Sequence, residues 1–440
     1  MNFQKINKRI IFYGSIFIII TLIIGNCVNL FNKEDENDNY LLGVAVIALS
    51  NSNSTSFTKQ IGTSGEYTMG GGVSTDLIGN IYLTGSATGR LDGNHESGGF
   101  LIKYDSYGNK QWTKQMNGTI GYGVSVDSSK NVYVTGSTRI ALDGNNLTGD
   151  VDVFTVKYDS NGNIQWIKQM GASGSSTYGY GISTDSNGNS YVTGYTEGSL
   201  DGNSSNGDKD IFLIKYDSNG NKQWTKQIGT SGTDEGFGVS TDSNGNIYVT
   251  GTYYSNLFLI KYNSSGNEQW TQQMGSFVVC RGISIDTSGN VYVTGFTAES
   301  LNGNTLIGKE DVFIVKFDSN GNIQWIKQMG VSGERTEGFG ISNDSGGNVY
   351  ITGFTFGGLD GNNLTGYVDI FTIKYDSSGN KQWTKLLGAY KSGSEGIGVS
   401  TDLSGNIYVT GSTTGGLDRN SLIGKSDAFL IKYSASGDKK

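Results

Sequence analysis

The chain has 440 residues, including 68 glycines and no proline, together with 25 Tyr, 19 Phe and 6 Trp. This supply of aromatics excludes a disordered Gly-rich chain, and the net charge of −8 argues against broad nucleic-acid binding. His95 is the only histidine, so a Ser-His-Asp triad or a multi-His metal site would depend on one imidazole. We therefore expect neither an enzyme nor any catalytic residue, and no cofactor.

Residues 1–27 have the pattern of a signal peptide. A basic start, with Lys5, Lys8 and Arg9, precedes the apolar run 10–24. This run is short for a helix that spans ~30 Å of hydrocarbon. Cys27 at its end resembles the cysteine of a bacterial lipobox, which becomes the lipidated first residue of the mature chain.

Asn26 departs from the lipobox motif, which usually has a small residue at that position. The alternatives are a plain cleaved signal, or an uncleaved anchor in which Cys27 is a buried hydrophobe. If Cys27 is a lipobox cysteine, the sequence predicts an extracytoplasmic, membrane-anchored lipoprotein at the outer membrane or cell surface. This role of Cys27 also leaves Cys280 without an intrachain disulfide partner.

Residues 28–56 follow as a polar, acidic tether, within which the apolar run 41–49 is a possible extra strand. From residue 57 to residue 440 the chain is repetitive, and three signatures each occur seven times. They are Q-W-T/I-K-Q-M/I-G, G-V/I-S-x-D-x-x-G-N-x-Y-V-T-G and F-L-I-K-Y-D-S-x-G-N; in the first copy, at Phe57, the tryptophan is absent.

Each repeat unit predicts four short strands, which we call A to D. In one unit these are 180–185, 190–196, 210–217 and 222–229, rich in Val, Ile, Thr, Tyr and Phe and bounded by Asp, Asn, Ser and Gly. The segment D-S-N-G-N suits a tight turn, because Asp caps the local backbone and Gly adopts positive φ at little cost. Lys130 replaces this glycine in one copy, so its turn is expected to be the most strained.

These units predict an all-β protein, a seven-bladed β-propeller of four-stranded antiparallel blades. Strand C is apolar on both sides, as expected of a sheet packed between two neighbours. Residues 57–62 supply a lone D strand, while the last unit stops after strand C. Pairing the two would close the ring and remove both sheet edges, whereas a linear solenoid would need polar caps.

The repeats resemble the bacterial seven-bladed β-propeller repeat (SBBP repeat) family, through GVSTDSNGNIYVTG, DIFLIKYDSNGN and QWTKQIG. The resemblance covers residues 57–433. It implies the fold and an extracytoplasmic setting, but no common activity and no shared catalytic residues.

The loops divide the predicted propeller into two faces. The A–B and C–D turns share one face and are uniform, which indicates a structural role. The B–C and D–A loops share the other face, which we call the loop-rich face. The B–C loops carry L-D-G-N or a close variant at Asp92, Asp143, Asp201, Asp360 and Asp418, with Asn302 in one copy and Arg419 in place of the glycine in the last.

These aspartates could hold Ca²⁺, but turn chemistry explains them more simply, and they lack the EF-hand spacing. The fourth unit has no such loop between Tyr253 and Leu257, which predicts a notch in the loop-rich face. The lysine of strand C, from Lys103 to Lys432, recurs in every unit, as expected of a structural residue.

Candidate ligand contacts lie at the variable position of the G-x-G pattern that opens strand A. The residues there are Gly71, Tyr122, Tyr180, Phe237, Arg281, Phe339 and Ile397. In a closed ring they cluster at the channel mouth, where aromatics and one arginine could stack on a sugar or grip a peptide. The alternative is that they pack as core between blades.

Arg281 is the strongest single candidate, because it breaks the symmetry of the set beside the notch. We therefore predict ligand binding at Tyr122, Tyr180, Phe237, Arg281 and Phe339, and no metal site. Cys280 next to it is expected to be a small buried hydrophobe rather than a nucleophile.

The leading hypothesis is a binding or scaffold module, monomeric and attached to the membrane only by its lipid, that presents its loop-rich face to a protein or glycan. The alternatives are a purely structural lipoprotein of the envelope and, by analogy with propeller lyases and hydrolases, an enzyme. Analogy of fold carries little weight for function.

Overall fold

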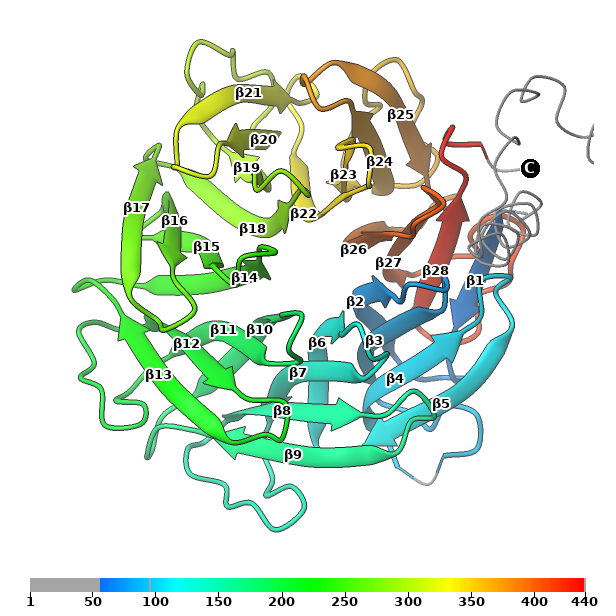
Figure 1. The fold of residues 1–440 in the computed structure, drawn as a ribbon. Coiled ribbons are helices and arrows are strands. Elements are labelled where there is room, and N and C mark those ends of the chain that lie inside the picture. Colours follow the sequence, from blue (N-terminus) through cyan, green and yellow to red (C-terminus); the bar gives the residue numbers. More distant parts are fainter. Residues whose placement is uncertain (1–55, 95, 439–440) are drawn as a thin grey trace, which may run out of the picture. The chain divides into compact units, whose positions relative to one another are not determined.

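A computed structural model of the chain describes residues 56–94 and 96–438, all within one compact unit, Ser54–Lys440. The described residues form 28 strands in seven four-stranded antiparallel sheets. The sheets stand around a central axis as the blades of a propeller (Figure 1), so the predicted fold is confirmed. In this part of the chain there is no helix with the length and apolar character needed to cross a membrane.

The blades share one strand order from the axis to the rim, and we number them by their innermost strands. The innermost strands are β2 (Thr68–Thr75), β6 (Thr119–Val126), β10 (Thr177–Thr184), β14 (Asp234–Thr241), β18 (Val278–Ile285), β22 (Thr336–Asn343) and β26 (Ser394–Thr401). Next come β3 (Ile81–Ala87), β7 (Val132–Thr138), β11 (Ser190–Thr196), β15 (Ile247–Tyr253), β19 (Val291–Thr297), β23 (Val349–Thr355) and β27 (Ile407–Thr413). The third strands are β4 (Gly98–Tyr104), β8 (Asp152–Tyr158), β12 (Asp210–Tyr216), β16 (Asn256–Tyr262), β20 (Asp311–Phe317), β24 (Asp369–Tyr375) and β28 (Asp427–Tyr433). The outermost are β5 (Lys110–Met116), β9 (Ile164–Met170), β13 (Lys222–Ile228), β17 (Glu268–Met274), β21 (Ile323–Met329), β25 (Lys381–Leu387) and β1 (Phe57–Ile61).

The ring closes through the N-terminal strand, as predicted. Strand β1 pairs antiparallel with β28, from Phe57 opposite Lys432 to Ile61 opposite Ala428. Around the axis, each innermost strand contacts those of both adjacent blades, and β26 contacts β2. The seventh blade therefore combines strands from the two ends of the repeat region.

The turns that join the first two strands of each blade are held by a repeated aspartate network. In blade 3, Asp185 Oδ1 accepts the backbone N–H groups of Asn187 and Asn189, at 2.9 and 3.0 Å. Its Oδ2 accepts Asn189 Nδ2 at 2.8 Å and the Tyr191 hydroxyl at 3.0 Å. Gly188 has φ +75°, and Lys130 takes the equivalent place in blade 2 with φ +67°. The expected strained position is therefore present at Lys130.

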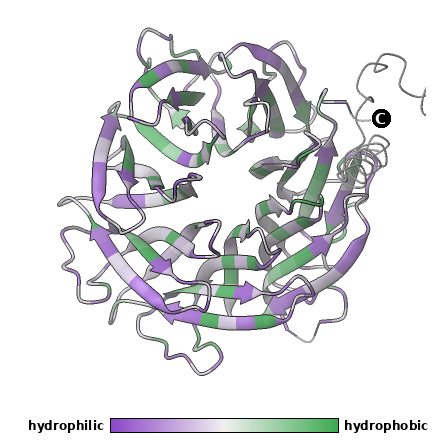
Figure 2. Cartoon of the chain, in the orientation of Figure 1, coloured by the Kyte–Doolittle hydropathy of each residue, from purple (hydrophilic) through white to green (hydrophobic). Residues whose placement is uncertain are grey.

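The hydrophobic core lies between adjacent blades rather than within one blade. One cluster, for example, joins Ile211 and Leu213 of blade 3 to Val239, Val249 and Ile260 of blade 4. The third strands are almost wholly buried, whereas the outermost strands begin with exposed residues. Figure 2 shows most of each outermost strand in purple and pale colours.

The lysine of the third strand ties each blade to the next, as a structural residue would. Its Nζ donates to a carbonyl in the outer turn of the following blade, for example Lys157 to Ser218 O at 2.8 Å. The same Nζ lies 5.2 Å from the centroid of the Tyr133 ring. Lys432 completes the ring by donating to Ser106 O of blade 1, at 2.8 Å.

Candidate functional site

The predicted ligand residues lie on a β-bulge that recurs in the innermost strands. In β10 the pairing with β11 passes from Gly179 directly to Gly181, so Tyr180 has no partner on the adjacent strand. Each of these residues is skipped in the same way: Tyr122, Tyr180, Phe237, Arg281, Phe339 and Ile397. A bulge bends its strand and re-aims the extra side chain, which separates these residues from the regular packing of the sheets.

Five of the bulge residues touch in sequence around the axis, and we call them the axial arc: Tyr122, Tyr180, Phe237, Arg281 and Phe339. The Tyr180 ring lies 5.2 Å from that of Tyr122, edge to face, and 5.5 Å from that of Phe237, stacked. Arg281 Cζ lies 4.2 Å from the Phe237 centroid and 5.6 Å from that of Phe339. The structure therefore brings together all five residues that the sequence singled out, from five consecutive blades.

The axial arc is widened by aromatics that the sequence reasoning missed. Tyr195 stacks against Tyr178 and lies 5.8 Å from Tyr180. At the other end, Phe354 contacts both Phe339 and Phe356, at 5.5 and 5.9 Å. The bulge residues of blades 1 and 7 are not aromatic, being Gly71 and Ile397. The positions equivalent to Tyr195 hold Ser86, Ser137 and Ser412 in blades 1, 2 and 7. The channel mouth is thus aromatic on one side only.

Arg281 is a cation without a carboxylate partner among the described residues. Its guanidinium contacts rings instead, including Phe296 at 5.9 Å, and its Nε is buried with no hydrogen-bond partner. Burial lowers the pKa of Arg281, while Glu235 and Glu337 oppose that shift. The group stays charged, because an arginine is not deprotonated in proteins.

The two carboxylates that act on Arg281, Glu235 and Glu337, both lie beside other cations. Glu337 Oε1 lies 3.6 Å from Arg335 Nε, and Arg335 also binds Glu310. Glu235 pairs with Lys209 at 2.6 Å. In the bidentate pair of Glu310 with Arg335, Nε and Nη2 donate at 2.6 and 2.8 Å. The guanidinium of Arg281 is therefore a charge at the channel mouth that forms no ion pair with a described residue.

Two carboxyls near the axis have raised pKa values. Burial, together with the negative charge of Glu310, raises the pKa of Glu337 to about 7. Burial also raises the pKa of Glu395, which occupies the equivalent strand position in blade 7. Burial therefore disfavours the charged form of both carboxyls relative to an exposed glutamate.

The notch predicted in blade 4 is present as a two-residue turn. Tyr254 and Ser255 connect β15 to β16 with φ +46° and +71°. The Tyr254 side chain is 74% exposed, and Phe277, at the start of the next blade, is 64% exposed. Phe277 directly precedes β18, the strand that carries Arg281. The exposure of Tyr254 and Phe277 could not be predicted from residue type, because it depends on the shortened loop.

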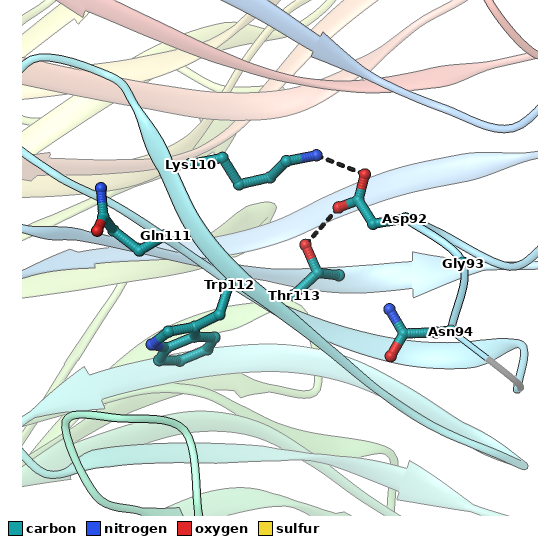
Figure 3. Close-up of a pocket in the computed structure, with 7 residues that line it drawn as sticks. All are labelled: Asp92, Gly93, Asn94, Lys110, Gln111, Trp112 and Thr113. Atoms are coloured by element: carbon teal, nitrogen blue, oxygen red, sulfur yellow. Dashed lines mark hydrogen bonds and ion pairs between the residues drawn. The ribbon is translucent and has the colours of Figure 1, made fainter.

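The L-D-G-N segments have a structural role at the rim. Asp92, Asp143, Asp201, Asn302, Asp360 and Asp418 all have positive φ, as in a tight Asp-Gly turn. The segments fold back onto the outermost strand, where Asp92 accepts from Lys110 and Thr113, both at 2.5 Å. Figure 3 shows this carboxylate directed at both partners in a shallow rim pocket. The Asp92 oxygens are therefore engaged by protein donors rather than open to a cation.

Cys280, the cysteine within the described residues, is a buried thiol, as the sequence predicted. Cys280 is fully buried, with its Sγ 3.0 Å from Thr250 Oγ1, and burial raises the pKa of its thiol to about 12. A thiol in that state is not a nucleophile at neutral pH. No group of three His, Cys, Asp or Glu side chains that could hold a metal ion occurs in residues 56–94 and 96–438. His95 and Cys27 lie outside the described residues.

Comparison with protein families gives six matches to one repeat, the SBBP β-propeller repeat. The matched segments are residues 111–142, 165–201, 223–258, 269–301, 324–359 and 382–418. Each segment runs from an outermost strand into the following blade. The repeat predicted from the three signatures is thus confirmed.

Among curated proteins, an uncharacterized WD repeat-containing protein of Acanthamoeba polyphaga mimivirus is 27% identical, covering 71% of this chain and 26% of the relative. Regulatory protein FlaEY of Caulobacter vibrioides is 28% identical, covering 34% of this chain and 17% of the relative. This chain therefore spans about a quarter or less of the length of these relatives. Among solved structures, the β-propeller domain of Myceliophteria thermophila Cps50 (Swd1) has a TM-score of 0.50 at 9% identity, covering 85% of this chain and 98% of that domain. At this identity the likeness extends to the fold alone.

Proposed function

We propose that this chain, which carries six SBBP β-propeller repeats, is an extracytoplasmic binding module, anchored to the membrane by a lipid on Cys27. It acts as a monomer at the outer membrane or cell surface, and binds a protein or glycan through its loop-rich face. The axial arc, continuous across five blades, is the observation that carries this proposal.

The chemistry of the axial arc supports recognition rather than reaction. Half-buried rings offer stacking surface for a sugar or an aromatic side chain. Arg281 adds one charge whose carboxylate neighbours are already paired. A carboxylate on the ligand could therefore accept charge-assisted hydrogen bonds from the guanidinium of Arg281.

The asymmetry of the channel mouth also supports a specific ligand. A ring of seven equal blades has no structural need for aromatic or arginine bulge residues on blades 2–6 but Gly71 and Ile397 on blades 1 and 7. Exposed Phe356 continues the aromatic surface outward from Phe339 through Phe354, and exposed Phe277 directly precedes the strand that carries Arg281. Such exposed apolar groups in one region mark interaction sites.

The test is a screen of the full chain against arrays of glycans and matrix proteins, with Arg281→Ala in parallel. Arg90→Ala is the matched control, because Arg90 is an exposed arginine outside the axial arc. We expect saturable binding by the wild type and by Arg90→Ala that is lost in Arg281→Ala, with equal melting temperatures. Absence of any saturable ligand would favour the alternative, a purely structural envelope protein.

A further inference from the structure

The opposite end of the axis carries a ring of hydroxyls that is broken in two places. Threonine ends the innermost strand in four blades, and its Oγ1 donates to the carbonyl of the equivalent residue in the preceding blade. Thr75 donates to Thr401 O at 2.9 Å and Thr401 to Asn343 O at 2.7 Å. The residue is Val126 in blade 2, and Ile285 and Asn343 in blades 5 and 6. The longer break therefore spans two adjacent blades.

Asn343 lies at the longer break, and its side-chain amide forms no hydrogen bond with a described residue. Its Nδ2 and Oδ1 are both buried and have no hydrogen-bond partner among the described residues. Folded proteins rarely leave both ends of a buried carboxamide unpaired. The side chain is thus suited to a partner that offers one donor and one acceptor.

A cavity of about 220 Å³ lies beside Asn343. It is lined by strand ends from blades 1, 5, 6 and 7, and no lysine or arginine is among them. The lining aspartates, such as Asp402, are occupied by turn hydrogen bonds. The absence of lining cations and the four carboxylates disfavour an anionic ligand. The volume is below the roughly 300–1,000 Å³ of sites for drug-sized molecules, so it suits a single sugar ring or one side chain.

The rim of this cavity is apolar where the other blades are polar. Leu77 and Leu403 are 60% and 65% exposed, although the equivalent turn position holds a serine or threonine in the other five blades. Ile285 adds a third apolar side chain to the lining. An exposed leucine at a solvent turn contributes little to the fold, but it can contact an apolar group of a ligand.

We propose that this cavity binds an acetamido group, as carried by an N-acetylated amino sugar or an acetylated lysine. Rotation of the Asn343 side chain into the cavity lets its Oδ1 accept the ligand N–H and its Nδ2 donate to the ligand carbonyl. The acetyl methyl then lies against Leu77, Leu403 and Ile285. The site is independent of the axial arc, which lies nearer the other end of the same strands.

The experiment is saturation-transfer NMR on the full chain with N-acetylglucosamine, N-acetyllysine amide and glucose. We expect saturable binding of one or both acetamides, with a Kd on the order of 1 mM for so small a ligand, and none of glucose. The acetamide that binds more tightly identifies the source of the group. No saturable binding of either acetamide would overturn the proposal.

Two variants make the test specific. Asn343→Thr introduces the residue that ends the innermost strand in four other blades. We expect this variant to have the same or a higher melting temperature, and to bind the acetamide about tenfold or more weakly. Leu403→Ser copies the turn of other blades and removes one apolar wall, again with loss of affinity and no loss of fold. Arg281→Ala should leave acetamide binding unchanged. Unaltered binding in both Asn343→Thr and Leu403→Ser would overturn the assignment of the site.

Discussion

At the residue scale, the charge of Arg281 is the unusual feature of the channel mouth. A guanidinium packed against three rings gains cation–π attraction, but its buried Nε lacks a hydrogen bond. Replacing a poorly paired buried charge with an apolar side chain is often neutral or stabilising. The arginine is therefore better explained by recognition than by stability.

This explanation predicts the behaviour of Arg281→Met. The free energy of unfolding should stay within about 1 kcal/mol of wild type or rise, because methionine keeps the ring contacts and removes the desolvation cost. Urea unfolding of wild type and Arg281→Met measures this difference in the free energy of unfolding. A loss of several kcal/mol would instead identify Arg281 as a structural element of the core.

Glu337 predicts a pH dependence of stability. Its pKa is about 7 in the folded chain and roughly 4.3 when unfolded, so the folded state holds the proton more tightly. Its contribution is complete below about pH 4 and is lost as the pH rises through 7. Glu310, Arg335 and Arg281 are the charges that face it. Thermal melts between about pH 5 and pH 8 should show a downward slope that is smaller in Glu337→Gln; equal slopes would contradict the assignment.

Sequence reasoning found the residues of the axial arc but not the charges around them. The repeated G-x-G aligns the seven bulges, so Tyr180 and Arg281 could be compared position by position. The pairs Glu235–Lys209 and Glu310–Arg335 join a loop or strand end to the following blade, and no repeat signature marks them. Nor does any repeat signature show that the side-chain amide of Asn343 is buried without a hydrogen-bond partner among the described residues.

At the scale of elements, the turns carry most of the local information. The pattern D-x-x-G-N predicted both the aspartate cap and the positive-φ glycine, and the structure contains both. The L-D-G-N loops were harder, because their contact with the outermost strand involves residues about twenty positions further along the chain. They were correctly expected to be turns, but their role in covering the rim strand could not be seen from spacing.

Lys130 offers a test of turn strain. Lys130→Gly should raise the free energy of unfolding by about 0.5–1 kcal/mol, because a residue with a Cβ is disfavoured at φ +67°. The reverse change at Gly245, with φ +78°, is the matched control and should lower stability by a similar amount. Chemical denaturation of both variants measures the effect, and the same sign for both would contradict it.

At the scale of the whole molecule, the ring depends on a strand from the far end of the repeat region. Strand β1 covers the edge of β28, and Ile61 is 93% buried, being 7% exposed. Complementary ends were visible in the sequence, since one unit lacked its fourth strand. The number of blades and the closure were therefore predictable, whereas the asymmetry of the channel mouth required the structure.

Ring closure predicts the effect of truncation. A chain that begins at residue 63 should lose about 3 kcal/mol or more, from the burial of Ile61 and the lost strand pairing, and should self-associate through the open edge of β28. A chain that begins at Ser54 keeps β1 and serves as the control. Denaturation and light scattering test both statements. A stable monomer from residue 63 onward would show that closure by β1 is dispensable.

The axial arc is tested most directly by equilibrium binding curves of wild type and Arg281→Ala for the ligand that the array screen identifies. The expected result is saturable wild-type binding, weakened by about thirtyfold or more in the variant, as at a central arginine hot spot, with unchanged melting temperature. Superimposable curves would show that the axial arc is core rather than a binding surface.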